Sequence, residues 1–141
     1  MTSLRTIRPS SSFSFVLPDS IRERYDDRVS SFWLDGRPLL LQLSSYFRTE
    51  GPQVGAQERL AQRIAKHEEN WTMWKEEIYL ECSVDQAAGE FSDEKGILWL
   101  HTYLVWPHLT IYATISGPEA EVRSPNNWAM DALRSIRPTT Q

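Results

Sequence analysis

Residues 97–117 have the sequence ILWLHTYLVWPHLTIYATISG, two runs of large side chains on either side of Pro107-His108. In the second run, Leu109–Ile115, apolar residues alternate with Thr and Tyr, a period of two that is typical of a β-strand. The first run, Ile97–Trp106, has the same period but is apolar on both sides. We therefore predict two antiparallel strands joined at Pro107-His108, with a turn at residues 116–118.

The chain before this pair predicts more strands. Phe13, Phe15 and Leu17 alternate with smaller side chains until Pro18, which cannot donate to a β-ladder. Val29–Leu34 and Leu39–Phe47 flank Asp35-Gly36, a dipeptide that favours a hairpin with a tight type I′ turn.

The next predicted strand lies within residues 68–94, which are rich in acidic side chains. Ile78, Leu80, Cys82 and Val84 alternate with polar residues, which predicts a strand over 78–84. We expect residues 85–95, which are polar and contain Gly89, to connect this strand to the next one.

Two helices are predicted. Residues 57–67 place Leu60 and Ile64 on one face at a spacing of four. Ser124 and Pro125 are typical of an N-cap and a first helical position, so a second helix is expected from there to Ile136. Residues 21–28 are highly charged and predict a loop or a short helical turn. We expect residues 1–11 to be a flexible tail and residues 12–137 to form one domain.

The predicted order is strand, hairpin, helix, three-stranded meander and helix, which is an α+β arrangement with helices packed on an antiparallel sheet. With the segments FSFVLP at 13–18 and WAMDALRSI at 128–136 and the helix that begins at Gln57, this order resembles the PsbP-like fold. That fold is shared by the photosystem PsbP proteins, the Ran-binding Mog protein and bacterial DcrB-type proteins. The resemblance spans residues 13–136. It implies a single domain, a mainly antiparallel sheet with two principal helices, and a role in binding rather than catalysis.

Composition narrows the classes of function. The chain has 141 residues and a formal net charge of −4, which disfavours nucleic-acid binding. Its single cysteine, Cys82, excludes an internal disulfide and is typical of a reducing compartment. No apolar run precedes Ser10, and His101, Pro107 and His108 interrupt the longest uncharged stretch. We therefore expect a cytoplasmic protein without a signal peptide or a membrane span.

The residues that carry chemistry form no recognisable catalytic or metal-binding motif. The spacings of His67, His101, His108 and Cys82 match no zinc module. Cys82 is predicted in the middle of a strand, where an inert thiol is expected. The six glycines are isolated and form no phosphate-binding loop. We therefore expect no catalytic residue, no metal and no cofactor.

Charge is distributed unevenly along the chain. Residues 68–94 contain nine acidic residues and one lysine, a segment charge of −8. An acidic surface attracts a basic partner, and Trp71 and Trp74 would supply apolar anchors of the kind that dominate interfaces. The alternative is that the acids only keep a strand edge and a loop solvated. The predicted partner-binding residues are Trp71, Trp74, Glu76, Glu77, Glu81, Asp85, Glu90, Asp93 and Glu94.

These features favour a protein-binding module, a bacterial immunity protein that inhibits a basic toxin or secreted effector. Two alternatives stay open. The first is an adaptor or chaperone that holds an apolar partner segment on an exposed sheet face bearing Leu104 and Trp106. The second is an enzyme for a small ligand, with His101 in a pocket lined by Trp99 and Tyr103. The two-sided apolar strand at 97–106 also leaves open a homodimer through a sheet face.

Overall fold

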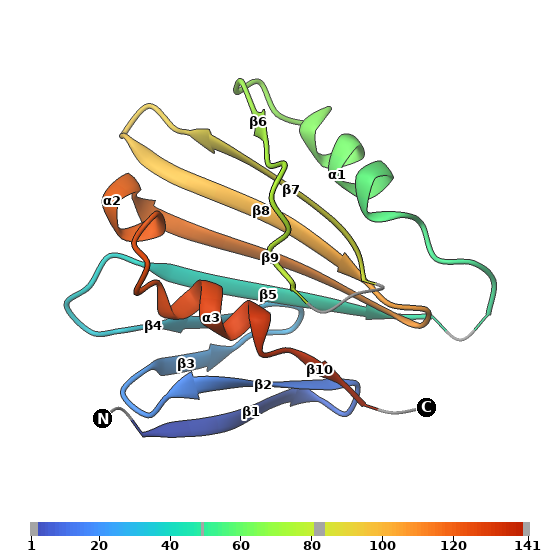
Figure 1. Cartoon of the computed structure of the whole chain (residues 1–141), viewed down its shortest axis with the longest axis horizontal. Coiled ribbons are helices and arrows are strands. Elements are labelled where there is room, and N and C mark those ends of the chain that lie inside the picture. Colours follow the sequence, from blue (N-terminus) through green and yellow to red (C-terminus); the bar gives the residue numbers. More distant parts are fainter. Residues whose placement is uncertain (1–2, 49, 81–83, 140–141) are drawn as a thin grey trace.

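The protein is built around a large antiparallel sheet and a small one (Figure 1). The computed structural model describes residues 3–48, 50–80 and 84–139. The large sheet has seven strands in the order β3-β4-β5-β9-β8-β7-β6, and each neighbouring pair is antiparallel. Their bounds are β3 Arg22–Tyr25, β4 Ser30–Trp33, β5 Leu40–Phe47, β6 Thr72–Met73, β7 Asp85–Ser92, β8 Ile97–Val105 and β9 Leu109–Pro118.

The small sheet joins the two ends of the described chain. It consists of β1 Leu4–Ser10, β2 Phe13–Pro18 and β10 Arg137–Pro138, with β2 in the middle. The prediction of a flexible tail over residues 1–11 is therefore wrong for β1. This segment pairs with β2, and Ile7 is 4% exposed within the core. Its polar residues fit an edge strand, which has one face toward solvent.

Three helices complete the fold: α1 Ala56–Ile64, α2 Glu119–Val122 and α3 Trp128–Arg134. In Figure 1, α3 crosses in front of the large sheet with the small sheet below it. The predicted helix at 57–67 is confirmed as α1, although it ends earlier. The predicted last helix begins later than expected because Asn127, not Ser124, caps it. The Asn127 side chain accepts from the backbone N–H groups of Ala129 and Met130.

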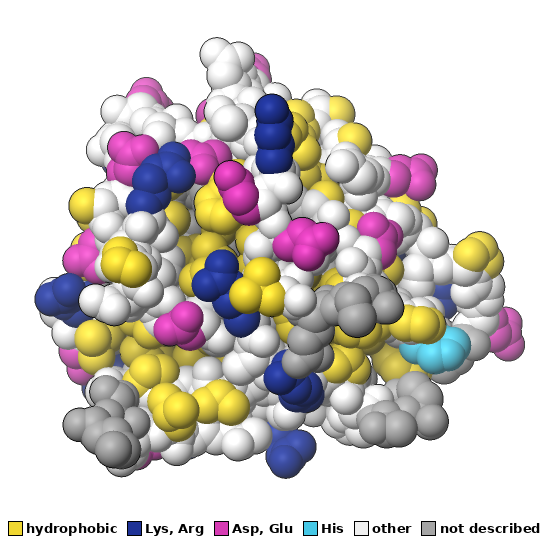
Figure 2. All heavy atoms as spheres, viewed as in Figure 1, with side chains coloured by type: hydrophobic (Ala, Val, Ile, Leu, Met, Phe, Trp, Pro, Cys, Tyr) yellow, Lys and Arg dark blue, Asp and Glu magenta, His cyan; other side chains and the backbone are white. Residues whose placement is uncertain are grey.

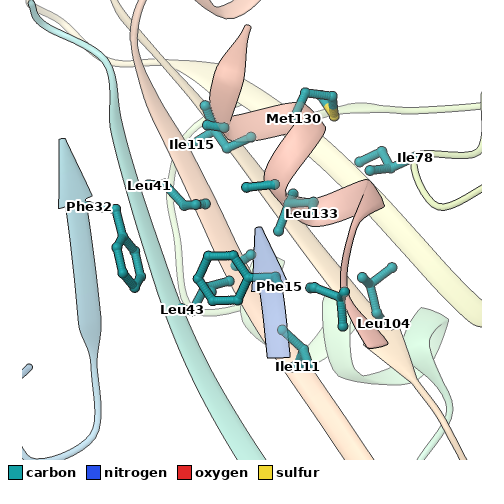
Figure 3. Packing of buried hydrophobic residues seen from close by; sticks show 14 of the residues in the cluster. Phe15, Phe32, Leu41, Leu43, Ile78, Leu104, Ile111, Ile115, Met130 and Leu133 are labelled. Atoms are coloured by element: carbon teal, nitrogen blue, oxygen red, sulfur yellow. The ribbon is translucent and has the colours of Figure 1, made fainter. Parts of the chain in front are cut away.

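The main core lies between the large sheet, the small sheet and α3. Phe15 from β2, Leu41 from β5, Ile111 from β9 and Leu133 from α3 meet there, as Figure 3 shows. A second, smaller cluster lies on the opposite face of the large sheet, where Leu60 of α1 packs on β7 and β8. The sheet is therefore covered on both faces along β7 and β8, which explains the two-sided apolar pattern of β8.

Several local predictions are wrong, among them the turn expected at residues 116–118, which form the paired end of β9. The hairpin at Asp35-Gly36 is longer than predicted: a turn is present there, with Arg37 N donating to Leu34 O at 3.0 Å, but six residues separate Trp33 and Leu40, the last paired residues of β4 and β5. Residues 22–25, expected as a loop or helical turn, form strand β3. Residues 78–80 are not in a strand, and the predicted connection at 85–95 contains β7 instead. Cys82 lies outside the described residues.

The fold class is confirmed: the protein is a mainly antiparallel α+β domain with helices packed on its sheet.

Candidate functional site at the edge of the large sheet

Strand β6 forms one edge of the large sheet. Thr72 pairs with Glu90 and Met73 with Gly89 of β7. A side chain at Gly89 would not fit easily, because a Cβ there would lie 3.2 Å from the Met73 Sδ and 3.3 Å from the Trp71 Cε3. The glycine thus allows β6 and its flanking side chains to close on β7.

Two hollows adjoin the segment Thr72–Glu77. One, of about 710 Å³, lies between this segment and the α2–α3 region, and Trp74, Glu90 and Met130 contribute to its wall. The other, of about 410 Å³, lies beside β7 and the start of α1 and includes Glu77 and Asp85. Both share residues 73–76. We call residues 72–77 with these two hollows the edge surface.

The edge surface is partly apolar. Met73 is 41% exposed, and Trp74 is half-buried against the main core. In Figure 2, hydrophobic side chains are visible in the hollow between α3 and the segment after β6, with acidic and basic side chains around it. A cleft that combines apolar surface with charges at its border is suited to a protein segment.

Trp74 is held in place by a buried acid. Its Nε1 donates to Glu90 Oε1 at 2.7 Å, and Glu90 also accepts from Arg123 Nη2. Arg123 Nε donates to Glu119 Oε2 at 2.8 Å. The hydrogen bonds to Glu90 and Glu119 raise the pKa of Arg123. Because Arg123 neutralises Glu90, the role of this acid at the site is to fix Trp74 rather than to present charge.

Asp131 is exposed on the wall of the larger hollow. Glu76 and Glu77 are the acids of the segment 72–77 that stay available to a partner. Both are exposed, and within the described part of the chain neither forms an ion pair. Asp85 serves the fold, because its Oδ2 accepts from the Ala56 backbone N–H at 2.9 Å at the start of α1. A carboxylate at a helix N-terminus is favoured by the helix dipole.

The structure therefore brings five of the nine predicted residues together at the edge surface: Trp74, Glu76, Glu77, Asp85 and Glu90.

The remaining predicted residues lie elsewhere or outside the description. Asp93 accepts hydrogen bonds from the Lys95 and Ile97 backbone and from Trp99 Nε1 in the β7–β8 turn. Glu94 is exposed in the same turn. Strand β7 separates this turn from Asp85 by roughly 23 Å, at 3.3 Å for each residue. Glu81 lies outside the described residues.

Trp71 packs on the opposite face from Trp74. Its ring centroid lies 4.6 Å from that of His101 and 4.8 Å from that of Phe91. His101 is 5% exposed, and its Nδ1 lies 2.5 Å from the Tyr112 hydroxyl. Burial, with the nearby positive charges of Arg63 and His67, lowers the pKa of His101 to about 3. The imidazole is thus a neutral member of a packed aromatic cluster.

The surface expected for an adaptor is only partly present. Leu104 is fully buried in the main core, so its predicted exposure is wrong. Trp106 is half-buried and contacts the Tyr79 ring edge-to-face at 5.5 Å between centroids. Trp106 and the exposed Phe47 line an apolar hollow of about 330 Å³ beside the turn between β8 and β9.

Sequence reasoning missed several residues of the edge surface. Met73 lies between the two tryptophans, and Arg123, Met130 and Arg134 come from a region about 50 to 60 residues further along the chain. Only Met73 carried a local signal, an apolar residue within a charged segment. The others reach the site because α2 and α3 fold back over the sheet.

Neither metal ligation nor a membrane span is indicated by the part of the chain that is described. In these ranges, no three His, Cys, Asp or Glu side chains gather closely enough to hold a metal ion. Likewise, no helix in them has the length and apolar character needed to cross a bilayer.

Two solved structures share the fold. One is a protein from Bacteroides thetaiotaomicron, with a TM-score of 0.64 and 10% identity over 99% of this chain. The chain spans about half the length of that protein, since 49% of it is covered. The other is cyanobacterial PsbP (CyanoP) from Synechocystis, with a TM-score of 0.68, 12% identity, and coverage of 99% of this chain and 94% of that one.

No protein-family model and no curated protein matches the sequence. At 10–12% identity the structural likeness establishes the fold alone. The chain has a PsbP-like α+β fold, as the resemblance implied.

Proposed function

We propose that the protein is a non-enzymatic, cytoplasmic protein-binding module that inhibits a basic partner, a bacterial toxin or secreted effector, by covering it with the edge surface. The observation that carries this proposal is the grouping of Trp74, Glu76 and Glu77 between two adjoining hollows. The hollows would receive side chains of the partner, and the two free carboxylates would attract its positive charges.

The arrangement supports a contact with two separable contributions. Trp74 and Met73 offer an apolar centre, which is where most of the energy of protein interfaces resides. Glu76 and Glu77 lie exposed at its rim, and rim charges act chiefly on the rate of association. The segment charge of −8 over residues 68–94 extends this attraction beyond the contact itself.

The test is a capture experiment with lysate of the organism that encodes the protein, at low and at high salt. The bait is the unaltered chain, the double variant Glu76→Lys/Glu77→Lys, or the control Glu68→Lys/Glu94→Lys. All four acids are exposed, and the control pair lines neither hollow of the edge surface. Any captured partner is then purified, and its affinity for each bait is measured.

We expect the Glu76/Glu77 variant to bind the partner about 10 to 100 times more weakly, mostly through slower association, and high salt to have a similar effect. The control is expected to stay within a few-fold of the unaltered chain. Equal losses in both variants would mean that general charge, not the edge surface, attracts the partner. An unaltered affinity in the Glu76/Glu77 variant would overturn the proposal.

The apolar hollow supports one alternative, an adaptor that holds an apolar partner segment. Phe47 is 48% exposed at its border. In that case the captured partner stays bound at high salt, resists both charge reversals and is lost with Phe47→Ser.

A further inference from the structure

A basic hollow lies on the face of the large sheet that α1 covers, and none of its lining residues lines the edge surface. It has a volume of about 200 Å³. Its wall comes from α1, the turn after it, β5 and β8. The lining residues are Tyr46, Arg59, Gln62, Arg63, Lys66 and Tyr103.

The hollow concentrates positive charge without compensation. Arg59, Arg63 and Lys66 follow one another at spacings of four and three, so the helical geometry places them on one side of α1. None of the described residues that line it is a carboxylate, and none of these three cations forms an ion pair within the described ranges.

Arg63 is held in a fixed position by two tyrosines. Its Nε donates to the Tyr103 hydroxyl at 2.8 Å, and its guanidinium carbon lies 3.9 Å from the centre of the Tyr112 ring. Because the Tyr103 oxygen accepts this bond, its own O–H proton remains available to donate. A rigid guanidinium beside a hydroxyl donor is a preorganised pair for an oxyanion.

Arg59 supplies the second independent observation. Its guanidinium carbon lies 5.7 Å from the centre of the Tyr46 ring, and its Nε is buried without a hydrogen-bond partner in the described structure. The dipole at the C-terminal end of α1 accounts for basic residues at 63 and 66. It does not account for Arg59 one turn earlier, nor for the Tyr103 hydroxyl at the same hollow.

We propose that this basic hollow binds the terminal phosphoryl group of a small phosphate monoester. A phosphate monoester carries about −1.5 to −2 charges near neutral pH and three acceptor oxygens. It therefore matches three cations and the Tyr103 hydroxyl better than a carboxylate or a phosphodiester, each of which carries one charge. The hollow has room for roughly six or seven water molecules at about 30 Å³ each, enough for a phosphoryl group.

The size also limits what the hollow encloses. At about 200 Å³ it is smaller than the roughly 300–1,000 Å³ of pockets that enclose a whole drug-sized ligand. The phosphoryl group occupies it, and the remainder of the ligand extends into solvent over the end of α1.

The test uses inorganic phosphate and pyrophosphate as probes, with sodium chloride at matched ionic strength as the reference. Thermal unfolding and titration calorimetry are measured for the unaltered chain, Arg59→Ala, Lys66→Ala and the control Lys95→Ala. Lys95 is exposed in the β7–β8 turn, so Lys95→Ala removes the same charge at a position outside the hollow. Circular dichroism checks that each variant is folded. Arg63 is left intact because it packs on Tyr112.

We expect both probes to raise the unfolding temperature above the chloride reference, because a ligand that binds only the folded state stabilises it. Arg59→Ala and Lys66→Ala should each weaken binding about 5- to 10-fold, and Lys95→Ala should leave it unchanged. A response equal to that of chloride, or equal affinities in all variants, would overturn the proposal. So would binding of a single-stranded oligonucleotide but of neither phosphate probe, because that pattern indicates a polyanion surface.

Discussion

His101 lies among Trp71, Phe91 and Tyr112, with its Nε2 lacking a hydrogen-bond partner in the described structure. Its pKa falls from an ordinary 6.5 to about 3, chiefly because burial disfavours the charged imidazolium. Below pH 6.5 the unfolded chain binds a proton at His101, whereas the folded chain keeps this imidazole neutral down to about pH 3. Between pH 6.5 and about 3, stability is therefore lost as the pH falls.

We expect His101→Gln to weaken this pH dependence. The folded protein should lose about 1.4 kcal/mol for each pH unit below 6.5 on account of His101, and the variant should lack that contribution. Glutamine keeps a polar group near the Tyr112 hydroxyl but does not titrate. Urea unfolding at pH 7, 6, 5 and 4 measures the slope.

His108→Gln is the control for this prediction, because His108 is exposed. If the slopes of the unaltered chain and of His101→Gln coincide, the buried imidazole does not govern the acid response.

Single residues also explain why some predictions from the sequence are wrong. In β7, Gly89 lies against Trp71 and Met73, Ala87 packs in the cluster with Leu60 of α1, and Ala88 packs in the main core. Small residues have low β-propensity, and the strand was therefore predicted about seven residues too early. The nine predicted site residues are likewise close in sequence, but the length of β7 separates Asp93 and Glu94 from Asp85.

At the scale of elements, α3 depends on its N-cap. The Asn127 Oδ1 accepts from Ala129 N at 2.9 Å and Met130 N at 3.0 Å, while its Nδ2 donates to Val122 O at 2.8 Å. The asparagine thereby satisfies two free N–H groups of α3 and links α3 to α2. Ser124 was the predicted cap because Pro125 follows it. Its hydroxyl instead accepts from Asn126 N.

Asn127→Ala is expected to destabilise the protein by about 1–2 kcal/mol, through the loss of the cap and of the buried bond to Val122. The unfolding temperature should fall by several degrees. Ser124→Ala should change it much less. Thermal unfolding of both variants decides the point, and a larger loss in Ser124→Ala would contradict the assignment of the cap.

Elements with a regular repeat of apolar residues were predictable from the sequence. Elements that form only by pairing with a neighbouring strand were not. Strands β8 and β9 and helix α1 follow directly from their repeating apolar residues. Strand β1 has one buried residue, Ile7, and β6 has two exposed residues, so neither has a pattern of its own. Each forms because a neighbouring strand presents a free edge to it.

At the scale of the whole molecule, the small sheet covers the side of the main core that faces away from the large sheet. Phe13, Phe15 and Leu17 of β2 face the large sheet, and β1 and β10 flank β2 on its two sides. The edge surface and the basic hollow lie on separate parts of the large sheet, so substitutions at one should leave the other unchanged.

Removal of residues 1–10 should destabilise the protein by at least about 2 kcal/mol, because it takes Ile7 out of the core and leaves an edge of β2 unpaired. Urea unfolding of the shortened chain measures the loss. As a control, Arg8→Ser alters an exposed side chain of the same strand and should have little effect. A shortened chain with unchanged stability would mean that β1 does not contribute to the core.

The hydrogen bond from Val16 N to Ser135 Oγ joins residues 119 positions apart. A ribosome that adds 5–20 residues per second needs roughly 6 to 24 s to make the chain between them. Throughout that interval the aromatic face of β2 has emerged without the helix that covers it. Until α3 has been made, the nascent chain therefore presents this apolar face to other chains and to chaperones.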